Sequence, residues 1–104
     1  MKKTLTILAL SVPLLASAVA KADVANGKRL AERWCNACHI VSPEQKAATT
    51  DASPFPGMSR QSSIDPARLA LFLLEPHPKM PGMSLTRTEA ADIASYINSV
   101  AQLR

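Results

Sequence analysis

Apolar residues recur at helical spacing in three separate stretches of the chain. Between Val24 and about Cys38 they fall on one face with charged residues elsewhere, which predicts an amphipathic helix. The apolar face of this helix would carry Gly27, Leu30, Ala31, Trp34 and Cys38. A glycine inside a helix costs up to about 1 kcal/mol relative to alanine. Gly27 therefore indicates either the close approach of another backbone or a frayed first turn.

Two further helices are predicted in the second half of the chain. The pair Asp65-Pro66 supplies an N-cap followed by proline at the first helical position. Residues 67–74 are nearly all apolar, so we expect this helix to be largely buried. The last helix, about Arg87 to Ala101, follows Thr86-Arg87-Thr88-Glu89, which has the form of a capping box. Its apolar stripe comprises Ala90, Ile93, Ala94, Ile97 and Val100, flanked by Tyr96.

The segments between the helices are rich in proline and polar residues. Ser42 to Ser63 contains three prolines and a glycine and is predicted to be a loop with at most one short helical turn. Glu75 to Ser84, EPHPKMPGMS, has the same number of each, which excludes a helix or an inner strand. Because no stretch has a convincing strand pattern, the predicted class is all-α, with three main helices and long loops. Loops of this length are unusual in so small a domain unless they wrap a cofactor.

The first 22 residues have the pattern of a secretory signal peptide. Met1-Lys2-Lys3 is a positive head, and residues 5–20 are almost entirely apolar. Small-x-small cleavage motifs end at Ala20 and at Ala22, and we expect cleavage after Ala22, so that the folded domain spans residues 23–104. The alternative is an uncleaved membrane anchor, but the apolar run is short for a span of about 20 residues.

Removal of this leader changes the charge balance. The chain of 104 residues has a formal net charge of +4, but Lys2, Lys3 and Lys21 lie in the leader. The remaining domain is nearly neutral, has no run of Lys or Arg and has few aromatic residues, which argues against nucleic-acid binding. A domain this small has a marginal core and often needs a disulfide, a metal or another staple. A large apolar cofactor would supply the missing core.

Both cysteines and one of the two histidines occur in the hexapeptide WCNACH, residues 34–39. A redox disulfide between Cys35 and Cys38 would have the C-x-x-C spacing of thiol oxidoreductases, but the βαβ pattern that accompanies it is absent from the sequence. A closed zinc site needs four ligands. His77 would have to complete it, and the adjacent Cys38 and His39 make poor joint tetrahedral ligands. The third interpretation is a covalent c-type haem.

The C-x-x-C-H spacing suits haem attachment for a geometric reason. Two thiols three residues apart lie about one helical turn apart on one face, where each can add to one of the two haem vinyl groups. The next residue, His39, can then place its imidazole under the iron as the proximal ligand. We therefore expect Cys35 and Cys38 to hold one haem c and His39 to ligate its iron.

The sixth iron ligand separates two kinds of haem protein. A site closed by methionine is typical of an electron carrier, whereas an open site binds O₂ or activates peroxide. The candidates are Met58, Met80, Met83 and His77. A methionine usually only fills gaps in a core. Met80, however, is flanked by prolines in a loop between two predicted helices, which would hold a weak thioether–iron bond in place, and Met83 is also plausible.

These motifs together resemble the class I mono-haem c-type cytochromes of bacterial periplasms, which are small and His/Met ligated. The likeness covers residues 23–104 and rests on three blocks: Gly27–His39, Ser53–Phe55 and His77–Ile97. It implies the cytochrome c fold, in which three main helices and long loops surround one covalently bound haem. It also implies that Met80, which precedes a proline and then a leucine and a capped last helix, ligates the iron opposite His39.

The resemblance implies two further packing features. The first and last helices would cross closely at Gly27, against Ile93, Tyr96 and Ile97. The carbonyl of Pro54 would accept the free ring N–H of His39, which fixes the imidazole and raises its donor strength. Pro56 offers a rival alignment for this role.

The function implied by the resemblance is that of a soluble periplasmic electron carrier and not an enzyme. It would exchange one electron with transient partners such as an oxidase, a reductase or a dehydrogenase. We expect a monomer that meets a membrane only through its partners and binds no nucleic acid. One alternative is a ligand-binding or sensing haem protein with a displaceable methionine, although the sequence offers no Arg-His pair placed to split peroxide. The other is the cytochrome subunit of a larger periplasmic dehydrogenase.

Overall fold

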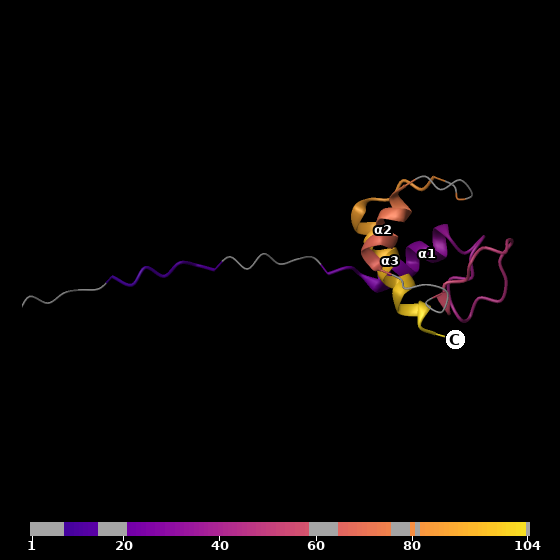
Figure 1. The fold of residues 1–104 in the computed structure, drawn as a ribbon, viewed down its shortest axis with the longest axis horizontal. Coiled ribbons are helices and arrows are strands. Elements are labelled where there is room, and N and C mark those ends of the chain that lie inside the picture. Colours follow the sequence, from indigo (N-terminus) through magenta and orange to yellow (C-terminus); the bar gives the residue numbers. More distant parts are fainter. Residues whose placement is uncertain (1–7, 15–20, 59–64, 76–79, 81, 104) are drawn as a thin grey trace, which may run out of the picture.

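The computed structural model describes residues 8–14, 21–58, 65–75, 80 and 82–103. These residues form three α-helices and no strand, which confirms the all-α class. The helices are α1 (Val24–Trp34), α2 (Pro66–Leu74) and α3 (Arg87–Ala101). The last helix packs against both of the others, so it forms the centre of the fold (Figure 1). No helix in the described part of the chain is long and apolar enough to cross a membrane.

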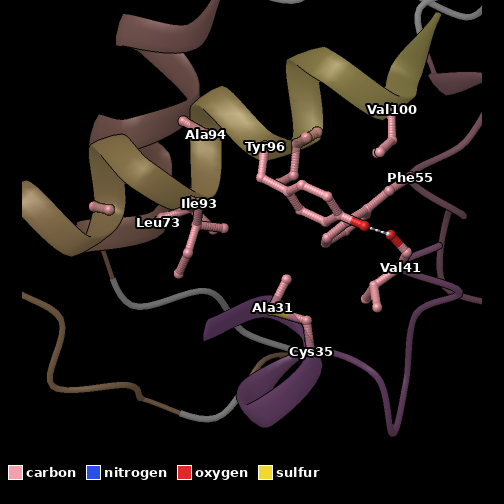
Figure 2. Packing of buried hydrophobic residues seen from close by; sticks show 11 residues of the cluster. Ala31, Cys35, Val41, Phe55, Leu73, Ile93, Ala94, Tyr96 and Val100 are labelled. Atoms are coloured by element: carbon pink, nitrogen blue, oxygen red, sulfur yellow. Dashed lines mark hydrogen bonds between the residues drawn. The ribbon is translucent and has the colours of Figure 1, made fainter. Parts of the chain in front are cut away.

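Helix α3 begins and ends where its sequence predicts. The hydroxyl of Thr86 accepts a hydrogen bond from the backbone N–H of Glu89 at 3.1 Å, and the Glu89 carboxylate accepts one from the N–H of Thr86 at 2.8 Å. This reciprocal pair is the predicted capping box. The predicted stripe is buried throughout and forms much of the core: Ala90, Ile93, Ala94, Ile97 and Val100. Tyr96 is buried beside it (Figure 2).

Helices α1 and α3 cross in backbone contact at Gly27. A Cβ atom at this position would lie 2.0 Å from the carbonyl oxygen of Asp92 and 2.9 Å from the Cβ of Tyr96. Ala31, one turn further along α1, is fully buried at the same crossing (Figure 2). Small residues at both positions allow the two helices to approach closely, so the close crossing predicted at Gly27 is confirmed.

Helix α1 is shorter than predicted, because it ends at Trp34 and not at Cys38. The residues that follow form a turn. In a helix that reached Cys38, the N–H of Cys38 would donate to the carbonyl of Trp34, four residues back. Instead it donates to the carbonyl of Cys35, at 3.2 Å, in a tight turn. The loop holds this turn: Thr49 donates to the carbonyl of Ala37 through both its N–H, at 2.8 Å, and its hydroxyl, at 2.7 Å, and the Thr50 hydroxyl donates to Cys38 at 2.9 Å.

Helix α2 starts as predicted but is not largely buried. The Asp65 carboxylate accepts a hydrogen bond from the N–H of Ala67 at 3.0 Å, and Pro66 occupies the first turn. Leu73 is the one residue of this helix that is buried. Leu71 is 63% exposed, and Phe72 and Leu74 also remain more than a third exposed. The polypeptide alone buries less of α2 than predicted, because a nine-residue helix that rests on α3 has one face covered by the chain, although its sequence is apolar on most sides.

The N-terminal segment lies outside this helical body. Residues 8–14 and 21–23 have no helical or strand structure, and the stretch 8–14 extends away from the helices (Figure 1). Its apolar side chains are almost fully exposed: Leu8, Leu10, Val12 and Leu14. The predicted positive head and much of the apolar run, in residues 1–7 and 15–20, lie outside the described residues. The fold therefore begins at Asp23, whose carboxylate caps α1 by accepting from the N–H of Asn26 at 3.0 Å.

Candidate functional site

The segment of the two cysteines and the histidine forms one tight turn after α1. The N–H groups of Cys38 and His39 both donate to the carbonyl of Cys35, at 3.2 Å and 2.8 Å. Both thiols are free; Cys35 is buried and Cys38 is partly exposed. Because one turn carries both sulfur atoms and the imidazole, the three side chains are offered from a single piece of backbone.

The buried thiol of Cys35 is held in its protonated form. Its burial, and secondly the negative charge of a neighbouring Cys38 thiolate, raise the pKa of the Cys35 thiol to about 11. Buried thiols of this kind are poor nucleophiles and poor redox groups at neutral pH, since the thiolate is the reactive form. This property does not fit a thiol oxidoreductase, for which a lowered thiol pKa is typical.

The imidazole of His39 is fixed by a backbone carbonyl across the loop. Its Nδ1 lies 2.7 Å from the carbonyl oxygen of Ser53. A carbonyl can only accept, so Nδ1 carries the proton and Nε2 keeps its lone pair free. The buried ring of Phe55 packs against the imidazole with a centroid distance of 5.2 Å. This is the tautomer and the orientation that a histidine needs in order to ligate a metal through Nε2.

The carbonyl in this bond belongs to Ser53, so the prediction that Pro54 or Pro56 provides it is wrong. Helical backbone is disfavoured for a residue that precedes proline, and Ser53, which precedes Pro54, lies outside the helices with its carbonyl oxygen 2.7 Å from the imidazole Nδ1. The next N–H along, that of Phe55, donates to the carbonyl of Ile40 at 2.9 Å. These two hydrogen bonds, one on each side of Pro54, join the segment 53–55 to the segment 39–40.

The side chain of Gln45 forms hydrogen bonds with several backbone groups around His39, a role that the sequence does not indicate. The Gln45 amide oxygen accepts from the N–H of Val41 at 2.9 Å. The Gln45 amide nitrogen lies within hydrogen-bonding distance of three carbonyls: Asn36 at 2.9 Å, His39 at 2.9 Å and Ala47 at 3.1 Å. An amide NH₂ has two protons, so one of them is shared. A lone glutamine in a polar loop offers no pattern by which the sequence alone could reveal this role.

Helix α3 supports the same segment from the other side. The hydroxyl of Tyr96 donates to the carbonyl of Val41 at 2.7 Å, and both residues are buried (Figure 2). Val41 lies two residues after His39. Its N–H donates to Gln45 and its carbonyl accepts from Tyr96, so the backbone next to the histidine is held at both groups. Burial, followed by the nearby charges of Glu32 and Glu44, raises the pKa of the Tyr96 phenol. The phenol therefore stays protonated and remains a donor at neutral pH.

The four candidates for a second axial ligand are not equally placed. Met58 and Met80 are both partly buried and pack against the hydrophobic core. Met83 is also partly buried, and its carbonyl accepts from the N–H of Leu85 at 2.9 Å. His77 lies outside the described residues. Packing alone therefore leaves Met58 and Met80 as equal candidates.

A surface hollow between α1 and the loop that follows it is separate from this chemistry. It is lined by Glu32, Asn36, Ala37, Val41, Ser42, Gln45, Ala47, Ala48 and Thr49. None of Cys35, Cys38, His39 and Met80 borders it. The hollow is open and partly polar, which does not suit a large apolar group.

The chemistry of the described residues fits a covalently attached haem. Cys35 and Cys38 are unpaired thiols on one turn. The Nε2 of His39 is the free nitrogen, because Nδ1 is engaged by Ser53. Exposed apolar side chains on α2 (Leu71, Phe72 and Leu74) and partly buried methionines against the core add the apolar surroundings that a macrocycle requires. The set supplies attachment, one axial donor and candidate thioethers for the other.

Comparisons with known proteins agree with this chemistry. Residues 24–101 match the family described as Cytochrome c. The chain is similar to cytochrome c-552 of Bradyrhizobium diazoefficiens, with 45% identity over 93 residues, which is 89% of each chain. No solved structure matches significantly.

Proposed function

This chain belongs to the cytochrome c family and is an electron carrier with one covalently attached haem c, and from that premise we propose how its residues perform this function. In this proposal Cys35 and Cys38 form the thioether links, and His39 and Met80 are the axial iron ligands. The domain acts as a soluble periplasmic shuttle that accepts and donates single electrons.

The observation that carries the assignment of His39 is its hydrogen bond to Ser53. Nδ1 lies 2.7 Å from the Ser53 carbonyl, which can only accept, so the proton is on Nδ1 and the lone pair of Nε2 is left to ligate the iron. Gln45 and Tyr96 hold the backbone on the C-terminal side of the histidine. A ligand held at both its ring and its backbone changes position little between oxidation states, which favours fast electron exchange.

The assignment of Met80 rests on its sequence context as well as its packing. Pro78 and Pro81 flank it, and proline restricts the backbone of its own residue and of the one before it. Met58, with equal packing against the core, belongs to the long loop before α2. A thioether binds iron weakly, so the stiffer segment is the better support for it.

The haem, when bound, supplies a one-electron iron couple. The chain supplies the rest: the two cysteines fix the group irreversibly, the histidine and the methionine keep both axial positions closed, and the apolar surroundings disfavour the extra charge of the oxidised iron. Closed axial positions leave no site for O₂ or peroxide, which is why a carrier function is favoured over a ligand-binding or sensing one.

The cellular setting belongs to the same proposal. The domain is exported, its leader is removed after Ala22, and it works in the periplasm as a monomer. Its redox partners are an oxidase, a reductase or a dehydrogenase, and it meets the membrane only through them. Support comes from the leader pattern and from the exposed, helix-free stretch 8–14, which contributes nothing to the core.

The test compares Met80→Ala with Met58→Ala in the exported holoprotein. Met80→Ala is expected to keep its covalent haem but to lose the low-spin state of the oxidised iron and to lower the reduction potential, because the soft thioether favours Fe(II). Met58→Ala is the matched control and should keep both properties while losing some stability. The reverse result, or a low-spin, unshifted Met80→Ala protein, would remove Met80 as the ligand.

A further inference from the structure

Helix α3 carries a buried carboxylate at its crossing with α1. Asp92 is only 3% exposed. One of its oxygens accepts from the backbone N–H of Asp23 at 2.7 Å, and the other accepts from the side-chain amide of Asn26 at 2.8 Å. Both donors belong to the beginning of α1, so this one side chain fastens the start of the domain to its last helix.

In the unprocessed chain both groups that donate to the Asp92 carboxylate, the backbone N–H of Asp23 and the amide of Asn26, are neutral. In the described part of the chain the only ion pair is Lys28–Glu32, which is exposed and does not involve Asp92. Around Asp92, α1 contributes the carboxylate of Asp23 and, behind Asn26, the guanidinium of Arg29, which donates to the Asn26 side-chain oxygen at 2.8 Å. Buried carboxylates are normally paired with a positive charge, since an unpaired one is costly.

The backbone nitrogen that touches Asp92 belongs to the residue at which the mature chain would begin. The leader pattern places cleavage between Ala22 and Asp23 on sequence grounds alone. The structure independently places the nitrogen of Asp23 against the buried carboxylate. Hydrolysis of that peptide bond consumes one water, leaves a carboxylate on Ala22 and converts the Asp23 nitrogen into an α-ammonium group.

We propose that signal cleavage completes the fold: the new α-ammonium of Asp23 forms an ion pair, at the edge of the core, with the buried carboxylate of Asp92, and the unprocessed chain lacks this pair. The inference rests on the cleavage site proposed above and not on the haem ligands. The geometry needs no rearrangement, because the nitrogen is already 2.7 Å from its partner. The neighbouring backbone also resists movement, since a Cβ at Gly27 would meet the Asp92 carbonyl at 2.0 Å.

The proposal can be tested by moving the α-ammonium charge away from the Asp23 nitrogen while keeping the hydrogen bond of that nitrogen to Asp92. Inserting Gly-Ser between Ala22 and Asp23 leaves a two-residue extension after cleavage and restores a neutral peptide N–H at Asp23. Such an extension fits, because the structure accommodates Lys21 and Ala22 at this place, with Lys21 exposed. The cap that Asp23 provides to α1 is unchanged. Intact mass of the secreted holoprotein reports the first residue of each form.

The readout is the folded-to-unfolded ratio in denaturant, measured with and without the extension. In the Asp92 background the extension should lower this ratio by about tenfold or more, since a buried carboxylate loses its counter-charge. In the Asp92→Asn background it should change the ratio by less than about twofold. Asp92→Ala serves as the second neutral background if the asparagine variant does not fold.

Two results would overturn the proposal. In the first, the mature chain begins at Asp23, but the extension changes the folded-to-unfolded ratio no more with Asp92 than in Asp92→Asn. The ion pair then contributes nothing, while the proposed export and processing still stand. If the mature chain begins at another residue, such as Lys21, the α-ammonium is not at this site and the proposed cleavage position fails with it.

Discussion

Gln45 makes several hydrogen bonds around the turn that carries Cys35, Cys38 and His39, and no pattern in the sequence indicates them. Its amide accepts from Val41 and reaches the carbonyls of Asn36, His39 and Ala47. The side chain thus replaces the regular hydrogen bonds that the turn forgoes when α1 stops at Trp34. At the residue scale, the position of His39 depends on an amide several residues away.

Replacement of Gln45 by methionine tests this dependence. Methionine has similar length but neither donates to the carbonyls nor accepts well from the N–H of Val41, so we expect a loss of about 2 kcal/mol in the free energy of unfolding. Because the backbone of His39 is released, the reduction potential should also shift. Gln102→Met, at the exposed C-cap of α3, is the matched control. Equal stability and potential in both variants would show that the network does not position the histidine.

Tyr96 offers a second residue-scale test, and its effect depends on pH. Tyr96→Phe leaves the buried Val41 carbonyl without its donor and should reduce the free energy of unfolding by about 2 kcal/mol at neutral pH. Folding raises the pKa of the phenol, through burial and then through Glu32 and Glu44. The stabilisation is therefore complete below the pKa of the unfolded phenol, about 10, and is lost as pH rises through the higher folded pKa.

Alkaline denaturation curves check that sign. The wild-type protein should lose stability above about pH 10 more steeply than Tyr96→Phe, whose curve lacks this contribution. Since Tyr96 is the only tyrosine of the chain, phenolate absorption follows its titration directly. A phenol that titrates at its ordinary pKa, or parallel stability curves for the two proteins, would contradict the role assigned to its hydroxyl.

At the scale of whole elements, α1 and α3 cross with no room for a side chain at Gly27. Gly27 touches the backbone of Asp92, and backbone atoms cannot move aside as a flexible side chain can. We expect Gly27→Ala to reduce the free energy of unfolding by about 3 kcal/mol, because the added Cβ forces the helices apart. Gly82→Ala is the matched control: nothing lies within 4 Å of a Cβ there, so its effect should stay within about 0.5 kcal/mol. Denaturant unfolding of both holoproteins decides between steric exclusion and a general intolerance of alanine.

The elements that were predicted well are those whose signals are local. Thr86 with Glu89, and Asp65 with Pro66, define helix starts through contacts within one turn, and both starts are found as predicted. The end of α1 was placed too late because the N–H of Cys38 donates to Cys35 in a turn that loop threonines hold, and helical periodicity does not reveal such contacts. The burial of α2 by the polypeptide was overestimated because an apolar composition does not show how many faces of a helix the rest of the chain covers.

At the scale of the whole molecule, the candidate site combines a local motif with contacts that only the fold creates. The C-x-x-C-H spacing is local, and it places two thiols and a histidine together at the end of α1, although the periodicity puts the thiols on the helix and not in the turn that follows it. The Ser53 carbonyl, the Gln45 amide and the Tyr96 hydroxyl reach this turn from other parts of the chain, and no pattern in the sequence marks them. The resemblance to the family implies the carbonyl of Pro54, and not that of the neighbouring Ser53, as acceptor for the His39 ring N–H, because the register of a loop cannot be fixed without its hydrogen bonds.

The optical spectra of the exported, purified protein, first oxidised and then reduced, test His/Met ligation most directly. A thioether bound to oxidised haem iron gives a sulfur-to-iron charge-transfer band, and attachment through two thioether links gives a c-type spectrum on reduction. We expect both in the wild-type protein at neutral pH. A c-type reduced spectrum without the charge-transfer band would contradict methionine ligation. It would place His77 or an open coordination position at the iron, and a ligand-binding function would then replace electron transfer through a closed haem.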